Sequence, residues 1–91
     1  MTQKPFDPAK NAINQAKHDL PLSFGDRIAD DQNYIELPSI RPEDDEERFK
    51  IIGLVETKLY TGVFTWRDGQ RRFISVRRSN NGEQRSYHNP G

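Results

Sequence analysis

The 91-residue sequence contains no cysteine and only two histidines, and these absences exclude several classes of protein. Without cysteine there is no disulfide framework and no zinc-finger spacing. No stretch approaches the roughly 20 apolar residues of a membrane-spanning helix, and the first residues lack the apolar segment of a secretion signal. We therefore expect one domain over residues 1–91 that is soluble, cytoplasmic and independent of membranes.

Large apolar residues are also scarce. Ile, Leu, Val and Phe together account for 20 of the 91 residues, which is just above the roughly 20% level below which disorder is expected. The sequence therefore allows only a thin core. A partner that binds only the folded state would stabilise such a domain further.

The net charge is zero, but the two halves of the chain differ in sign. Residues 1–47 carry 5 Lys/Arg and 11 Asp/Glu, whereas residues 48–91 carry 9 and 3. Most cations of the second half are arginines, whose planar fork of donors suits phosphate. The basic half either pairs with the acidic half or forms a patch for nucleic acid or an acidic partner.

Helix signals open the chain in FDPAKNAINQAKHDL. Asp7 can cap the free amides, and Pro8 suits the first helical position. Side chains then recur at helical spacing in an apolar stripe and a separate polar face. The stripe consists of Ala9, Ala12, Ile13, Ala16 and Leu20, and the polar face of Lys10, Asn14 and Lys17. The helix should end near His18 or Asp19, and SFGDRIADD predicts a second, short helix capped by Ser23.

From Glu47 onward the pattern alternates as in β-strands. Three strands are predicted in ERFKIIGLVE, KLYTGVFTW and QRRFISVRR, after an edge strand in NYIELPSI that Pro38 ends and a charged loop in RPEDDEE. Asn80 and Glu83 form a capping-box pattern for a last short helix, in which Gly82 is a local cost. The expected fold class is α+β, with two N-terminal helices packed on a three- to four-stranded antiparallel sheet and a short C-terminal helix.

Asp68-Gly69 is a strong hairpin signal between the last two strands, but it leaves their register open. With a two-residue loop, Ser75 and Arg77 share a face with Phe64. With a three-residue loop and a bulge, Val76 moves beneath Phe64, and Ser75 and Arg77 turn to the other face. We favour the second register because it separates apolar from polar side chains more cleanly.

We expect no metal site and no cofactor. The acidic run from Glu43 to Glu47 has oxygen ligands but no spaced ligand loop, so we interpret it as a solvated loop. There is no serine on a glycine-flanked strand-to-helix elbow and no glycine-rich loop of the kind that cradles phosphate.

Metal-free acid–base cleavage of RNA is a more specific hypothesis than a metal site or a nucleophilic serine. Cleaving a phosphodiester through the 2′-hydroxyl needs a base, an acid and cations on the phosphorane charge, and His, Glu, Lys, Tyr and Arg can supply them. The candidate catalytic residues of these types are Lys17, His18, Glu47, Arg48, Arg77, Arg78, Glu83 and Tyr87. Each also has a structural interpretation: Glu83 can cap a helix, Tyr87 can pack, and Arg48 can pair with acidic neighbours.

Several short motifs, taken in order, resemble the BrnT toxins of type II toxin–antitoxin pairs. The resemblance runs from about residue 5 to residue 88 and includes FDPAKNAINQAKH, SF, EERFKIIG and ISVRRSNNGEQRSY. Its most specific parts are Lys17-His18, Ile74-Ser75-x-Arg77-Arg78 and Glu83-x-x-x-Tyr87. Two positions depart from the family pattern, which usually has alanine in place of Ser79 and seldom a glycine at Gly82.

The resemblance implies a RelE-like fold and a metal-independent endoribonuclease that arrests growth by stopping translation. It also implies a BrnA-like antitoxin whose ribbon-helix-helix segment binds operator DNA, so that the toxin meets DNA only through the antitoxin. The usual assembly of such pairs would be a heterotetramer of two toxins and two antitoxins.

Within this hypothesis the candidate residues take roles by their chemistry. The residues expected to bind RNA phosphates are Arg72, Arg77 and Arg78: Arg77 and Arg78 hold the scissile phosphate and stabilise its developing charge, and Arg72, with Lys17 and Arg48, extends the cationic surface along the backbone. Glu47 or Glu83 is the base, and His18 or Tyr87 donates a proton. The alternative is a non-catalytic module of the same fold that binds RNA or a protein, and a third interpretation is a structural partner whose arginines pair with the acidic half.

Overall fold

The computed structural model describes residues 7–39 and 47–89, which form three helices and four strands. The helices are α1 (Pro8–His18), α2 (Phe24–Ala29) and α3 (Asn81–His88). The strands β1 (Ile35–Pro38), β2 (Phe49–Val55), β3 (Lys58–Arg67) and β4 (Gln70–Arg78) make one antiparallel sheet in that order. The predicted α+β fold, with two N-terminal helices and a short C-terminal one, is confirmed. Most of the predicted charged loop RPEDDEE lies outside the described residues.

The helix ends follow the local sequence signals. Asp7 accepts a hydrogen bond from the Ala9 N–H at 2.8 Å, and Pro8 begins α1. Asn80 and Glu83 form the predicted capping box at the start of α3. Ser23 precedes α2 as predicted, but its side chain makes no capping hydrogen bond. No helix in the described ranges is long and apolar enough to cross a membrane.

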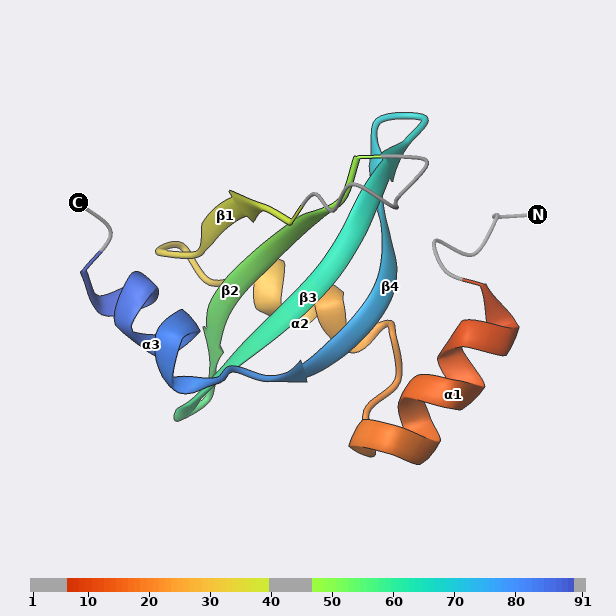
Figure 1. Ribbon diagram of the computed structural model, residues 1–91, viewed down its shortest axis with the longest axis horizontal. Coiled ribbons are helices and arrows are strands. Elements are labelled where there is room, and N and C mark those ends of the chain that lie inside the picture. Colours follow the sequence, from red (N-terminus) through yellow and green to blue (C-terminus); the bar gives the residue numbers. More distant parts are fainter. Residues whose placement is uncertain (1–6, 40–46, 90–91) are drawn as a thin grey trace.

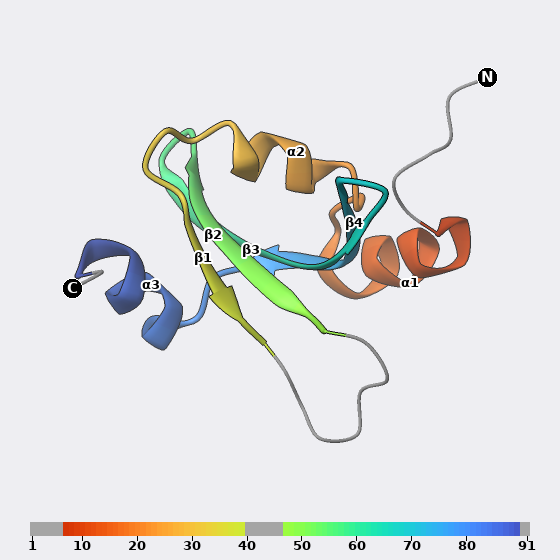
Figure 2. The ribbon, with the colours of Figure 1, turned by 90° about the horizontal axis from the view of Figure 1, so that it is seen from above.

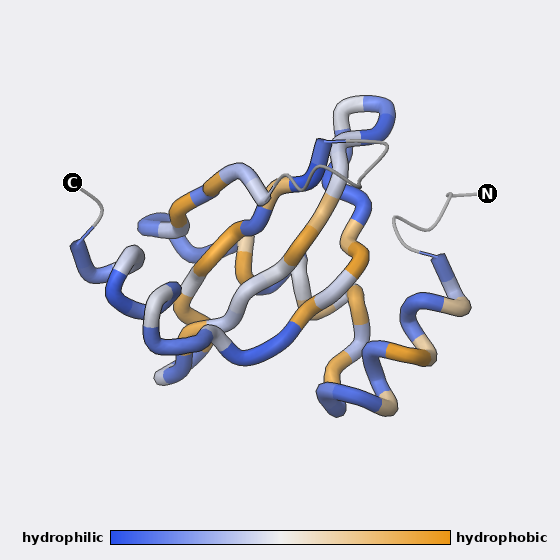
Figure 3. The backbone as a smooth tube through the Cα atoms, in the orientation of Figure 1, coloured by the Kyte–Doolittle hydropathy of each residue, from blue (hydrophilic) through white to orange (hydrophobic). Residues whose placement is uncertain are grey.

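The core lies between α2 and one face of the sheet (Figures 1 and 2). Its buried side chains are Leu22, Ile28, Ile51, Val55, Phe64, Phe73 and Val76. Gly53 allows α2 to approach, since a Cβ there would lie 2.5 Å from the carbonyl oxygen of Ile28. Hydrophobic segments accordingly concentrate in the strands, while α1 and α3 are mostly hydrophilic (Figure 3).

Helix α1 packs against β4 through its polar face. Asn14 is only 4% exposed, and its amide donates to the carbonyls of Leu20 (2.8 Å) and Val76 (2.9 Å) and accepts from the Val76 N–H (2.9 Å). The part of the apolar stripe that lies within α1 is instead exposed: Ile13 is 65% exposed, and the three alanines are exposed as well, whereas Leu20, beyond the end of the helix, packs against the core. A paired amide therefore anchors this helix, and the polar face that contains Lys10 and Lys17 turns towards the sheet edge.

The register of the hairpin combines the two alternatives. The loop has two residues, Asp68 and Gly69, both at positive φ, so the three-residue loop is wrong. A bulge nevertheless occurs further along, because Phe64 pairs with Phe73 while Val63 pairs with Ser75. The extra residue of β4 shifts the alternation, which brings Val76 into the core and turns Ser75 and Arg77 to the other face, as predicted.

Candidate functional site

The face of the sheet opposite α2 carries a group of cationic and hydroxyl side chains. The register aligns Lys50, Val63 and Ser75 in one row, Ile52, Thr61 and Arg77 in the next, and Thr65 with Arg72. Side chains that lie directly opposite on antiparallel strands share a face. We call this surface the Arg77 face, defined by Lys50, Thr61, Arg72, Ser75 and Arg77. The bulge in β4 is the local feature that places Ser75 and Arg77 on it.

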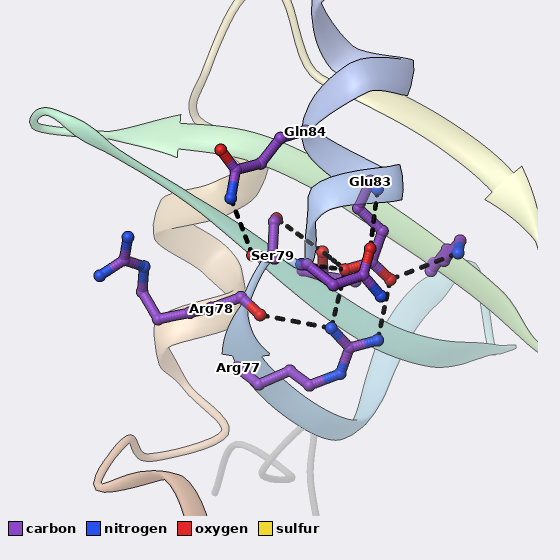
Figure 4. A network of polar contacts seen from close by, with 8 residues as sticks. Arg77, Arg78, Ser79, Glu83 and Gln84 are labelled. Atoms are coloured by element: carbon purple, nitrogen blue, oxygen red, sulfur yellow. Dashed lines mark hydrogen bonds and ion pairs between the residues drawn. The ribbon is translucent and has the colours of Figure 1, made fainter.

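A buried carboxylate organises one end of the Arg77 face (Figure 4). Glu83, from the first turn of α3, is 3% exposed and receives a two-pronged ion pair from Arg77, with N–O distances of 2.7 and 2.8 Å. The Thr61 hydroxyl donates to Glu83 at 2.9 Å, and the Asn80 N–H donates at 2.9 Å. Lys50 reaches the second carboxylate oxygen at 3.3 Å. Glu83, which belongs to the capping box of α3, thus also connects β2, β3 and β4 with this helix.

These contacts fix the ionisation of the pair. Burial opposes ionisation of Glu83, but hydrogen bonds from Arg77, Asn80 and Thr61 and the charge of Arg77 outweigh it and lower its pKa to about 2. The hydrogen bonds to Glu83 also raise the pKa of Arg77. The Arg77 side chain remains 29% exposed, so part of this side chain is open to solvent while Glu83 holds its guanidinium in place.

Two members of this network are absent from the sequence prediction. Lys50 lies between Phe49 and Ile51, and strand alternation alone would have placed it on the face opposite those apolar neighbours. The Thr61 hydroxyl also contacts that of Ser79 at 2.7 Å. No local pattern distinguishes this threonine from one that only packs in a strand.

Lys17 and His18, at the end of α1, approach the same end of β4. Burial lowers the pKa of His18, and the positive charges of Lys17 and Arg77 lower it further. His18 is therefore close enough to Arg77 to be affected by its charge, although the two come from elements at opposite ends of the chain. At pH 7 this histidine is predominantly neutral.

The Arg78 side chain lies on the opposite face of β4 from that of Arg77. Neighbouring residues of a strand point to opposite faces, and the Arg78 guanidinium lies over the ring of Tyr60, 5.5 Å from its centroid. Figure 4 shows the two arginine side chains extending in different directions. The structure therefore separates two residues that the sequence analysis assigned to one phosphate.

Tyr87 contacts Asp31 and not the Arg77–Glu83 pair. Its hydroxyl donates to Asp31 at 2.6 Å, and the same carboxylate oxygen accepts from the Leu54 N–H at 2.8 Å. The hydrogen bond to Asp31, with burial and the charge of Asp31, raises the pKa of Tyr87 to about 12. This contact fixes α3 to the turn that follows α2.

The remaining candidates lie towards the other end of the sheet. Arg72 is opposite Thr65, on the Arg77 face. Glu47 is exposed and lies five residues before Ile52, which is level with Arg77; at 3.3 Å per residue this is roughly 16 Å along the strand direction. Arg48 is half-buried and immediately precedes β2. Within residues 7–39 and 47–89, no three His, Cys, Asp or Glu side chains form a group that could hold a metal ion.

Comparison with known proteins assigns the chain to a family. No curated protein sequence matches it. The model of the family described as "Ribonuclease toxin, BrnT, of type II toxin-antitoxin system" matches residues 6–83, which include α1, the whole sheet and the Arg77–Glu83 pair. The chain therefore belongs to the BrnT family of ribonuclease toxins of type II toxin–antitoxin systems.

Proposed function

We propose that the chain is a metal-independent endoribonuclease whose active site is the end of the Arg77 face next to His18. Its cleavage of RNA would stop translation and growth until an antitoxin neutralises it. The observation that carries this proposal is the Arg77–Glu83 ion pair, which holds a partly exposed arginine side chain whose charge acts on His18. A preorganised donor of this kind can stabilise the charge that develops on a phosphorane without first having to reorganise.

His18 is the proposed proton acceptor. Because its pKa is lowered, it is neutral at pH 7 and can take the proton of the 2′-hydroxyl as that oxygen attacks the phosphorus. The bond to the 5′ oxygen then breaks, and Lys17 or water supplies the proton to this leaving group. The products are a 2′,3′-cyclic phosphate and a 5′-hydroxyl end. Lys50 and Arg72 extend the cationic surface along the RNA backbone.

Glu83 and Tyr87 take supporting roles in this proposal. Both oxygens of Glu83 are bonded, and with a pKa of about 2 it is a weak base, so we propose that it positions Arg77. Tyr87, with a pKa of about 12 and its proton donated to Asp31, is a weak acid at neutral pH. We assign Glu47 no part in the chemical step, because it precedes β2 and lies roughly 16 Å along the strand direction from the level of Arg77.

Family membership implies a cognate antitoxin. We propose that it is BrnA-like and has a ribbon-helix-helix segment that binds operator DNA. Two toxins and two antitoxins would then form the repressing complex. A toxin with a thin core gains stability from such a partner, since any ligand specific to the folded state shifts the folding equilibrium.

The test compares the two histidines of the chain. Purified protein without antitoxin is incubated with total RNA in excess EDTA, as wild type, His18→Ala and His88→Ala. His88 is exposed at the end of α3 and serves as the matched control. We expect the wild type and His88→Ala to produce cyclic phosphate ends, and His18→Ala to be slower by roughly a hundredfold or more.

The pH dependence gives a second readout. Activity should fall as the pH drops through the lowered pKa of His18, because protonation removes the base. This decrease should be centred below 6.5 and should be absent from the residual activity of His18→Ala. Equal cleavage by both histidine variants would overturn the assignment. Absence of cleavage by the wild type, in a translating lysate as well, would favour the binding-module alternative.

A further inference from the structure

A groove between α1 and β4 continues from the His18 end of the site. It is open to solvent and has a volume of about 260 Å³, and its main lining residues are Lys10, Ile13, Lys17, His18, Ile74 and Ser75. Asn14, which fixes α1 to the backbone of Val76, forms part of the lining between the two elements. The groove thus exists because α1 docks through a buried amide.

The groove is lined by both apolar and basic side chains. Ile13 and Ile74 contribute apolar surface from α1 and β4, and Ile13 is 65% exposed, so most of its surface is open to a ligand. Lys10, Lys17 and His18 provide nitrogen groups, and Ser75 provides a hydroxyl. None of the described residues that line the groove is a carboxylate, so the groove favours an anionic ligand with an apolar part.

The groove is also continuous with the proposed site. The charge of Arg77 affects His18, which lines the groove, and Ser75 lies two residues before Arg77 on the same face of β4. A chain of phosphates that passes Arg77 would therefore pass the mouth of the groove. Its volume is slightly below the roughly 300–1,000 Å³ of sites for whole small molecules, which suits one nucleoside unit.

We propose that this groove is a nucleotide subsite, in which the base next to the scissile phosphate lies between Ile13 and Ile74 and a flanking phosphate meets Lys10 and Lys17. This inference rests on the proposed function, since it identifies single-stranded RNA as the substrate of the same site. Apolar side chains that cover a base face, beside cations that follow the backbone, are the recurring arrangement of single-strand binding. Duplex RNA would not present an unstacked base to the groove.

The test measures binding of an RNA that cannot be cleaved. A fluorescently labelled, fully 2′-O-methylated octanucleotide of mixed sequence lacks the attacking hydroxyl, so affinity is separated from catalysis. The variant is Ile13→Ser, and the matched control is Leu54→Ser, because Leu54 is also an exposed apolar residue (41%) but does not line the groove. We expect Ile13→Ser to weaken binding roughly tenfold through lost apolar contact, and Leu54→Ser to bind like the wild type.

Salt dependence separates the two halves of the groove. Lys10→Ala should reduce the slope of log affinity against log salt by about 0.7, because one phosphate contact to a single strand is lost. Ile13→Ser should leave this slope unchanged while lowering affinity at every salt concentration.

Each outcome distinguishes this inference from the function on which it rests. If the wild type binds the methylated RNA through Ile13 but does not cleave unmodified RNA, the subsite stands and the ribonuclease proposal fails. If the wild type cleaves RNA and Ile13→Ser binds as tightly as Leu54→Ser, the subsite is wrong. It is also wrong if the wild type does not bind the octanucleotide.

Discussion

The buried carboxylate of Glu83 gives the sharpest quantitative prediction. Replacing it by glutamine keeps the shape of the side chain and removes its charge, leaving Arg77 and Lys50 without their shared counter-ion. The pKa of Glu83 is lowered from 4.5 to about 2, a difference equivalent to roughly 3 kcal/mol of folding stability at neutral pH. Losses of this order are typical when one partner of a buried pair is removed.

The pH dependence follows from the sign of the shift. A carboxyl group whose pKa is lower in the folded state stabilises the fold above its unfolded value of 4.5. This contribution disappears as the pH falls from about 4.5 towards 2. The difference in free energy of unfolding between wild type and Glu83→Gln should therefore be complete at pH 7 and close across that window.

Urea denaturation followed by circular dichroism measures this difference at several pH values. The control is Glu36→Gln, because Glu36 also pairs with an arginine, Arg71 at 3.0 Å, but in a more exposed position. We expect a loss of no more than about 1 kcal/mol for this control, and a fall in Tm of more than about 10 °C for Glu83→Gln. The reasoning is refuted if Glu83→Gln is as stable as Glu36→Gln at pH 7, or if its deficit is the same at pH 2.5.

Two further predictions concern the contacts that fix α1 and α3. Asn14→Ala should lower the free energy of unfolding by about 3 kcal/mol, because it leaves the Val76 N–H and carbonyl unsatisfied in a buried position. Urea denaturation should show this loss. The control Gln15→Ala, on the exposed side of α1, should change the free energy of unfolding by less than about 0.5 kcal/mol. Tyr87→Phe should lower the free energy of unfolding by about 1.5 kcal/mol, because the hydrogen bond to Asp31 is lost. The rate of RNA cleavage should stay within twofold of the wild-type rate. Abolished cleavage in a folded Tyr87→Phe protein would show that Tyr87 is catalytic.

Features encoded by neighbouring residues were predictable from the sequence. The Asp7-Pro8 start of α1, the Asn80–Glu83 capping box and the turn at Asp68-Gly69 all depend on local backbone requirements. These signals sufficed for the order of the elements and hence for the α+β fold. The residue types of Lys17, His18 and Arg77 likewise sufficed to make them candidates for the site.

Features that depend on tertiary contacts were not predictable in the same way. Helical spacing separates the two faces of α1, but only the docking on Val76 shows that the face with Asn14 is the buried one. The position of the bulge in β4 depends on how Phe73 and Val76 pack in the core, and the bulge decides which face Arg77 occupies. For the same reason the pair Arg77-Arg78, continuous in sequence, is divided between two faces.

The most direct test of the account is to compare Arg77→Ala with Arg78→Ala in the EDTA cleavage assay, with thermal unfolding to confirm that each variant is folded. Arg77→Lys, which keeps a cation beside Glu83, replaces Arg77→Ala if the latter unfolds. The account predicts that wild type and Arg78→Ala cleave RNA alike, whereas loss of Arg77 lowers the rate by roughly a hundredfold or more. Equal activity of folded Arg77 and Arg78 variants would contradict it.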